Sequence, residues 1–138
     1  MPGQENKTPL MVKILSGLLF LFGIFAFIGS VFLWGQGFIL AAPTGVDLSY
    51  PVTEILINAP ASIIAAIGIW RLRPYGYVAA QFTAGFYIYA SVEIFVKLAT
   101  STGPLALEIL IPQVLAVIVA MALIFYLWPI RQLFFEKA

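Results

Sequence analysis

Four long apolar segments, each free of charged residues near its middle, constrain this chain more than any other feature of its sequence. A helix that crosses the ~30 Å hydrocarbon core of a bilayer needs about 20 such residues. Lipid offers no hydrogen-bond partner to the backbone, so the segments are expected to be helices. The sequence therefore predicts an all-α polytopic membrane protein, a single-domain bundle with four transmembrane helices at about 10–40, 52–71, 75–98 and 104–129.

The composition agrees with this fold class. Of the 138 residues, 62% are hydrophobic and 9% are charged, whereas soluble domains have roughly 45–50% and about 25%. The first apolar segment is also longer than the apolar region of a signal peptide, about 7–15 residues, and is expected to stay in the mature protein. Residues 1–9 are expected to form a mobile tail, and residues 130–138 a short segment on the inner membrane interface.

The distribution of basic residues predicts the orientation in the membrane. Short cytoplasmic loops collect Lys and Arg. The side opposite the predicted cytoplasm carries only Lys97, together with Asp47. We therefore expect a multi-pass protein of a plasma or inner membrane with both termini in the cytoplasm. The other six of the seven basic residues lie on the cytoplasmic side in this arrangement, and they are Lys7, Lys13, Arg71, Arg73, Arg131 and Lys137.

Three carboxylates interrupt the apolar segments, and the predicted orientation places all of them in the outer half of the membrane. Ionisable groups at membrane depth usually face a bundle interior or water, and they commonly mark functional sites. The hypothesis is a transport or channel-type protein with an outward-facing site for a cation, a proton or an amine-bearing solute. Its candidate residues are Glu54, Asn58, Glu93, Glu108 and Gln113, of which the first two share a helix face with Ser62.

A purely structural interpretation of the same residues stays open. Glu54 and Glu108 each fall in a first helical turn, where the helix dipole stabilises a carboxylate. Glu93 precedes Lys97 by four residues, the spacing of an ordinary ion pair on one helix. Under this interpretation the three glutamates form no common site.

A short repeated pattern surrounds two of these glutamates. The letters EILI occur at residues 54–57 and at 108–111, and a proline precedes and follows each copy. The pattern is either accidental or a sign of parallel repeats related by an axis along the membrane normal. Pro60 and Pro112 each leave the carbonyl four residues earlier without its helical hydrogen-bond partner. Each proline either simply kinks its helix or frees a carbonyl that serves as a cation ligand.

Small residues recur every seven positions along the first apolar segment, at Ser16, Gly23, Ser30 and Gly37. Such a stripe lets a neighbouring helix approach closely. The stripe is internal packing, a pore-lining or sliding seam, or the contact of an accessory subunit with another membrane protein. The accessory subunit is the alternative function, and its other candidate contact is the aromatic helix at 75–98. A homo-oligomer is expected for either function because four helices enclose little space.

Enzymatic chemistry has little support in the sequence. The chain contains no His and no Cys, which removes the usual nucleophile pairs and the common zinc sites. We therefore expect no enzyme and no cofactor, with an intramembrane enzyme that uses paired carboxylates as the third choice. No basic cluster is dense enough to indicate nucleic-acid binding.

Overall fold

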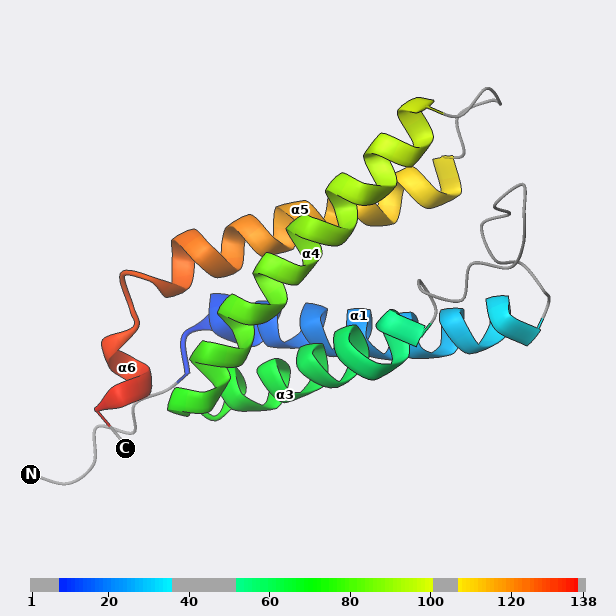
Figure 1. Ribbon diagram of the computed structural model, residues 1–138. Coiled ribbons are helices and arrows are strands. Elements are labelled where there is room, and N and C mark those ends of the chain that lie inside the picture. Colours follow the sequence, from blue (N-terminus) through cyan, green and yellow to red (C-terminus); the bar gives the residue numbers. More distant parts are fainter. Residues whose placement is uncertain (1–7, 36–51, 101–106, 137–138) are drawn as a thin grey trace, which may run out of the picture.

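The computed structural model describes residues 8–35, 52–100 and 107–136, and within them it contains helices and no strands (Figure 1). Three helices are long and apolar enough to cross a membrane, those of α1, α4 and α5. A fourth apolar stretch is shorter and consists of the π-helical turn η1 and helix α3. The elements are α1 (Leu10–Gly35), η1 (Glu54–Asn58), α3 (Ala59–Trp70), α4 (Pro74–Thr100), α5 (Leu107–Leu127) and α6 (Gln132–Phe135).

The predicted helix positions agree with these bounds where the two overlap. The first predicted helix reaches residue 40, but residues 36–40 lie outside the described part, as do residues 104–106 of the last. Helix α4 begins one residue before the predicted position and ends two residues after it. Helix α5 ends at Leu127, two residues before the predicted end, and Trp128 and Pro129 belong to the following turn.

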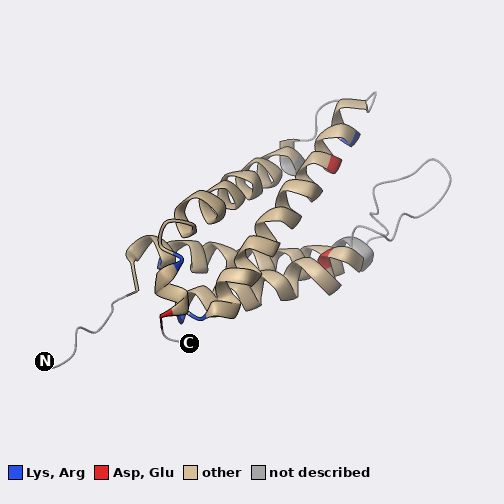
Figure 2. Cartoon of the chain, turned by 60° about the vertical axis from the view of Figure 1, so that its left-hand side comes forward, with Lys and Arg blue, Asp and Glu red and all other residues tan. Residues whose placement is uncertain are grey.

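The helices pack in chain order, with α1 on α3, α3 on α4, and α4 on α5. The α1–α3 pair and the α4–α5 pair lie close together at one end and diverge toward the other (Figure 1). The close end holds the start of α1, the turn between α3 and α4, and α6, and we call it the basic end because Lys13, Arg71, Arg73 and Arg131 belong to these segments (Figure 2). The opposite end is called the distal end.

The apolar core lies toward the basic end, where all the helices meet. Its members from α1 are Val12, Leu15 and Leu19, each with at most 1% of its surface exposed. Ala65, Ala66 and Ile69 of α3 join them, together with a set from α5. That set consists of Val119, Ala120, Leu123 and Leu127.

The turn between α3 and α4 brings two backbones into direct contact. The amide of Arg73 donates to the carbonyl of Gly68 at 2.9 Å, and that of Leu72 donates to Ile69 at 3.1 Å, a Schellman ending with Leu72 in the left-handed region at φ 49°. A Cβ on Gly76 would lie 2.0 Å from the carbonyl carbon of Gly68. Glycine is required at both positions for α3 and α4 to touch here.

Described residues near each terminus contact the basic end. Phe134 of α6 is fully buried, and its ring lies 5.6 Å from that of Tyr77 on α4. The segment predicted to lie on the inner interface therefore also packs against the bundle. In the predicted N-terminal tail, the hydroxyl of Thr8 donates to the carbonyl of Trp70 at 3.3 Å, whereas residues 1–7 lie outside the described part.

Candidate functional site

The side chain of Glu54 is buried in the first turns of the η1–α3 stretch, with 7% of its surface exposed. One carboxylate oxygen accepts a hydrogen bond from the side-chain amide of Asn58, one helical turn later. The four-residue spacing places both side chains on the same face of the helix. The predicted pairing of an acid with an amide on this face is therefore a direct contact.

Two further hydroxyls extend this contact across to α4. The Ser62 hydroxyl donates to the side-chain carbonyl of Asn58 at 3.1 Å and lies 2.7 Å from the Tyr87 hydroxyl. Because Ser62 has one proton and gives it to Asn58, Tyr87 must be the donor in the second bond. Every donor thus points toward Glu54, and we call Glu54, Asn58, Ser62 and Tyr87 the Glu54 chain.

A π-helical turn shapes the backbone beneath Glu54. The amide of Ala59 donates to the carbonyl of Glu54, five residues earlier instead of four. Pro60 follows at once; its ring would collide with the carbonyl four residues back in a regular helix, and the wider turn relieves that crowding. Turns of this kind are frequent at functional sites. Pro60 therefore changes the helix at the position that carries the buried carboxyl group.

Helix α1 covers the Glu54 chain with its stripe of small residues. A Cβ on Gly23 would lie 3.2 Å from the Cβ of Ser62 and 2.9 Å from Ile63, so the two helices are in close contact. The Ser16 hydroxyl donates to the carbonyl of Ala66 at 2.7 Å, and Ser30 is 3% exposed. These three members of the stripe are buried in the chain's own bundle, and Gly37 lies outside the described residues.

Gln113 of α5 contacts the same helix as the Glu54 chain but belongs to a separate cluster. Its side-chain oxygen accepts a hydrogen bond from the fully buried Ser91 at 3.1 Å. Ser91 lies one turn after Tyr87 on α4. No hydrogen bond joins this pair to Glu54 within the described part of the chain. Gln81, which also lies on α4, donates to the carbonyl of Leu123 on α5.

The other two glutamates are not part of the Glu54 chain. Glu93 forms an ion pair with Lys97 at 2.9 Å, and about half of its side chain is exposed. Lys97 lies in the last turn of α4, at the distal end of a helix that diverges from the α1–α3 pair (Figure 1). The backbone of Glu108 belongs to α5, but its side chain lies outside what the structure describes. The structure thus places Glu54 and Glu93 in different surroundings.

Sequence reasoning did not identify Tyr87 and Ser91 as members of polar clusters. The signal was present, because Thr83, Tyr87 and Ser91 recur at four-residue spacing on α4 just as the polar residues do on η1–α3. All three are at least 97% buried. The Thr83 hydroxyl has no hydrogen-bond partner among the described residues.

Neither a family model, nor a curated protein, nor a solved structure matches the chain. Its function must therefore be inferred from its own residues. Within the described ranges there is no group of three or more His, Cys, Asp or Glu side chains that would hold a metal ion. The Glu54 chain contains one carboxylate, which accepts a hydrogen bond from a neutral amide, and two neutral hydroxyls beyond that amide.

Proposed function

We propose that the chain crosses a plasma or inner membrane four times, with both termini in the cytoplasm. Three spans correspond to α1, α4 and α5. The fourth is the η1–α3 stretch, whose helical residues 52–70 reach ~28 Å at about 1.5 Å per residue. Four basic residues belong to the basic end, whereas Lys97 lies near the distal end and is paired with Glu93. This asymmetry supports a cytoplasmic basic end.

The absence of cysteine from the sequence makes this topology simple to test. Single substitutions Ala138→Cys and Thr44→Cys would be labelled in intact cells with a membrane-impermeant maleimide. We expect Thr44→Cys to react before permeabilisation and Ala138→Cys to react only afterwards. Equal labelling of both positions in intact cells would rule out the four-span arrangement.

Within this topology we propose a transport or channel-type protein that binds a singly charged cation, a proton or an amine at Glu54 from the outer side. The buried Glu54 carboxyl group carries the proposal. A carboxylate at membrane depth is costly and is commonly retained for binding or proton transfer. Its side chain is buried in the bundle, and Asn58, which is itself held by Ser62 and Tyr87, donates a hydrogen bond to it.

The composition of the site favours a single positive charge. The Glu54 carboxylate supplies one negative charge, and the side chains of Asn58, Ser62 and Tyr87 are neutral. Divalent cations are usually held by several carboxylates, whereas a proton or an alkylammonium group needs only one. The Asn58 amide lies between Glu54 and the hydroxyls and keeps its protons. The Glu54 chain therefore holds the Glu54 side chain in position and does not conduct protons to Tyr87.

Flux through the protein is tested in liposomes. Gradients of protons, sodium and ethylammonium are applied one at a time to vesicles that contain the purified protein. We expect the protein to discharge one of these gradients, Glu54→Gln to reduce that flux to the level of empty vesicles, and Glu93→Gln to retain it. Equal flux from Glu54→Gln and the unmodified protein would remove Glu54 from the pathway.

The second candidate function is an accessory subunit of another membrane protein or a homo-oligomer. The stripe of small residues is buried against η1–α3, so a partner must use another surface. The face of α4 that points away from the bundle carries aromatic side chains, with Phe82 and Tyr89 exposed by 58% and 68%. Under this alternative, Phe82→Ala and Tyr89→Ala abolish co-purification of the partner in mild detergent, whereas Glu54→Gln does not. We propose neither an enzymatic activity nor a cofactor.

A further inference from the structure

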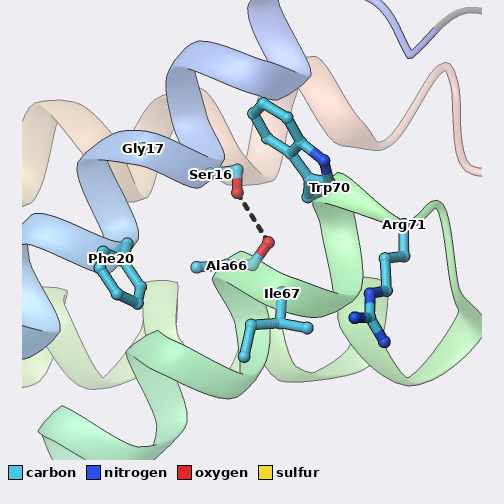
Figure 3. Close-up of a pocket in the computed structure, with 7 residues that line it drawn as sticks. All are labelled: Ser16, Gly17, Phe20, Ala66, Ile67, Trp70 and Arg71. Carbon is cyan, nitrogen blue, oxygen red and sulfur yellow. Dashed lines mark hydrogen bonds between the residues drawn. The ribbon is translucent and has the colours of Figure 1, made fainter.

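A groove between α1 and α3 near the basic end contains no residue of the Glu54 chain. Its volume is about 410 Å³, and it is lined by residues of both helices. Figure 3 shows Phe20 at one end and Trp70 with Arg71 at the other. The lining residues are Ser16, Gly17, Phe20, Ala66, Ile67, Trp70 and Arg71.

The floor of the groove is apolar in character although it contains a serine. The Ser16 hydroxyl is directed at the carbonyl of Ala66, 2.7 Å away, so both polar groups are satisfied within the protein (Figure 3). Gly17 leaves the groove open, since a Cβ there would have no atom within 4 Å. Phe20 and Ile67 are each a little over 40% exposed and form the sides. This surface fits a hydrocarbon chain.

The end of the groove at Trp70 is cationic. Arg71 lines it directly, and the Lys13 ammonium lies 5.9 Å from the centre of the Trp70 ring. Lys13 precedes Gly17 by one helical turn, so it lies on the groove side of α1. Both basic side chains are exposed, and neither forms an ion pair with a carboxylate of the described residues. An anion at this end would meet two positive charges.

We propose that this groove is a binding site for one anionic phospholipid of the leaflet at the basic end. The acyl chain lies along Gly17 and Ile67, and the phosphate lies between Lys13 and Arg71. Tryptophan and basic side chains suit the level of the headgroups, and basic pockets between helices bind anionic headgroups. The proposal is independent of the function proposed for Glu54, and it holds whether or not the protein transports a solute.

Tryptophan quenching by brominated lipid tests the proposal at the site itself. In the full chain with Trp34→Phe and Trp128→Phe, Trp70 is the one fluorescent tryptophan. Detergent micelles of this protein are titrated with phosphatidylglycerol or phosphatidylcholine that carries bromine on the acyl chains. We expect half-quenching at a roughly thirtyfold lower mole fraction of the anionic lipid, the scale set by two basic side chains.

Matched variants separate a specific site from general contact with lipid. Lys13→Gln with Arg71→Gln should remove the preference for the anionic lipid, and Arg73→Gln should keep it. Gly17→Leu fills the groove and should weaken quenching by both lipids, whereas Gly29→Leu, on a glycine of α1 with equally open space, should not. Equal quenching by the two lipids, or a preference that survives the double substitution, would overturn the proposal. Reversal of the quenching by inorganic phosphate would also overturn it, because a free anion would then be the ligand.

Discussion

The basic end and the distal half of this protein bury different kinds of side chain. At the basic end, all the helices meet around leucine, valine, isoleucine and alanine side chains, and α6 packs against the same region. Toward the distal end, where the helix pairs diverge, the buried set includes Ser30, Glu54, Asn58, Ser62 and Ser91. This difference predicts that the basic end contributes most of the folding stability.

The largest effect is expected where the backbones touch. Gly76→Ala places a methyl group 2.0 Å from the carbonyl carbon of Gly68, which forces α3 and α4 apart at the basic end. We expect a loss of about 3 kcal/mol or more in folding stability, at the upper end of overpacking effects. Thermal unfolding in detergent measures it. Gly85→Ala, which meets no atom within 4 Å, should be neutral or slightly stabilising; equal effects would contradict the close contact.

A cavity in the apolar core should reduce the folding stability slightly less than Gly76→Ala does. Leu123 is fully buried, and Leu123→Ala is expected to lower stability by about 2 kcal/mol through lost packing. The control is Leu115→Ala on the same helix, where the side chain is 48% exposed. Chemical unfolding in mixed micelles compares the two variants. The idea that the basic end provides the stability would fail if the Leu115 variant were equally destabilised.

The hydrogen bonds of the polar half should contribute less to the folding stability than the packing of Leu123 does. Tyr87→Phe removes the donor to Ser62, and Ser62→Ala removes the bridge to Asn58. Hydrogen bonds between transmembrane helices contribute on average ~0.6 kcal/mol, so each variant should lose about 1 kcal/mol or less. A double-mutant cycle by thermal unfolding should show that the two losses do not add. Strict additivity would mean that the two hydroxyls do not interact.

The smallest effect is expected at the exposed ion pair. Glu93 and Lys97 are both about half exposed, and such pairs contribute roughly 0–1 kcal/mol. Glu93→Gln should therefore leave thermal unfolding within about 0.5 kcal/mol of the unmodified protein. A loss comparable with that of Leu123→Ala would show that Glu93 has a structural role that its exposure does not indicate.

Much of the helical architecture follows from the sequence, because segments of about 20 apolar residues have few other structures available in lipid. The contact of Glu54 with Asn58 also follows, since both residues lie on one helix at a spacing that fixes their relative position. Predictions of this kind depend on local geometry and need no knowledge of neighbouring helices.

The contacts between helices could not be predicted in the same way. Outward and inward faces are both apolar in a membrane protein, so the pattern does not say which face of α4 meets α3. The contact of Tyr87 with Ser62 could therefore not be predicted. The docking of Phe134 against Tyr77 was missed for the same reason. The sequence also could not decide whether Glu93 would face Glu54 or Lys97, and the ion pair with Lys97 is what the structure contains.

The central claim, that Glu54 is a binding site for one positive charge, is tested most directly by calorimetric titration of the purified protein. Ethylammonium and sodium are titrated in two buffers of different ionisation enthalpy, so that protons released on binding are counted. Gln keeps the size of the side chain and the acceptor for Asn58 while it removes the charge. We predict binding of a cation or release of a proton by the unmodified protein and by Glu93→Gln, and a loss of at least roughly tenfold in affinity for Glu54→Gln, equivalent to about 1.4 kcal/mol. Unchanged affinity in Glu54→Gln would contradict the account.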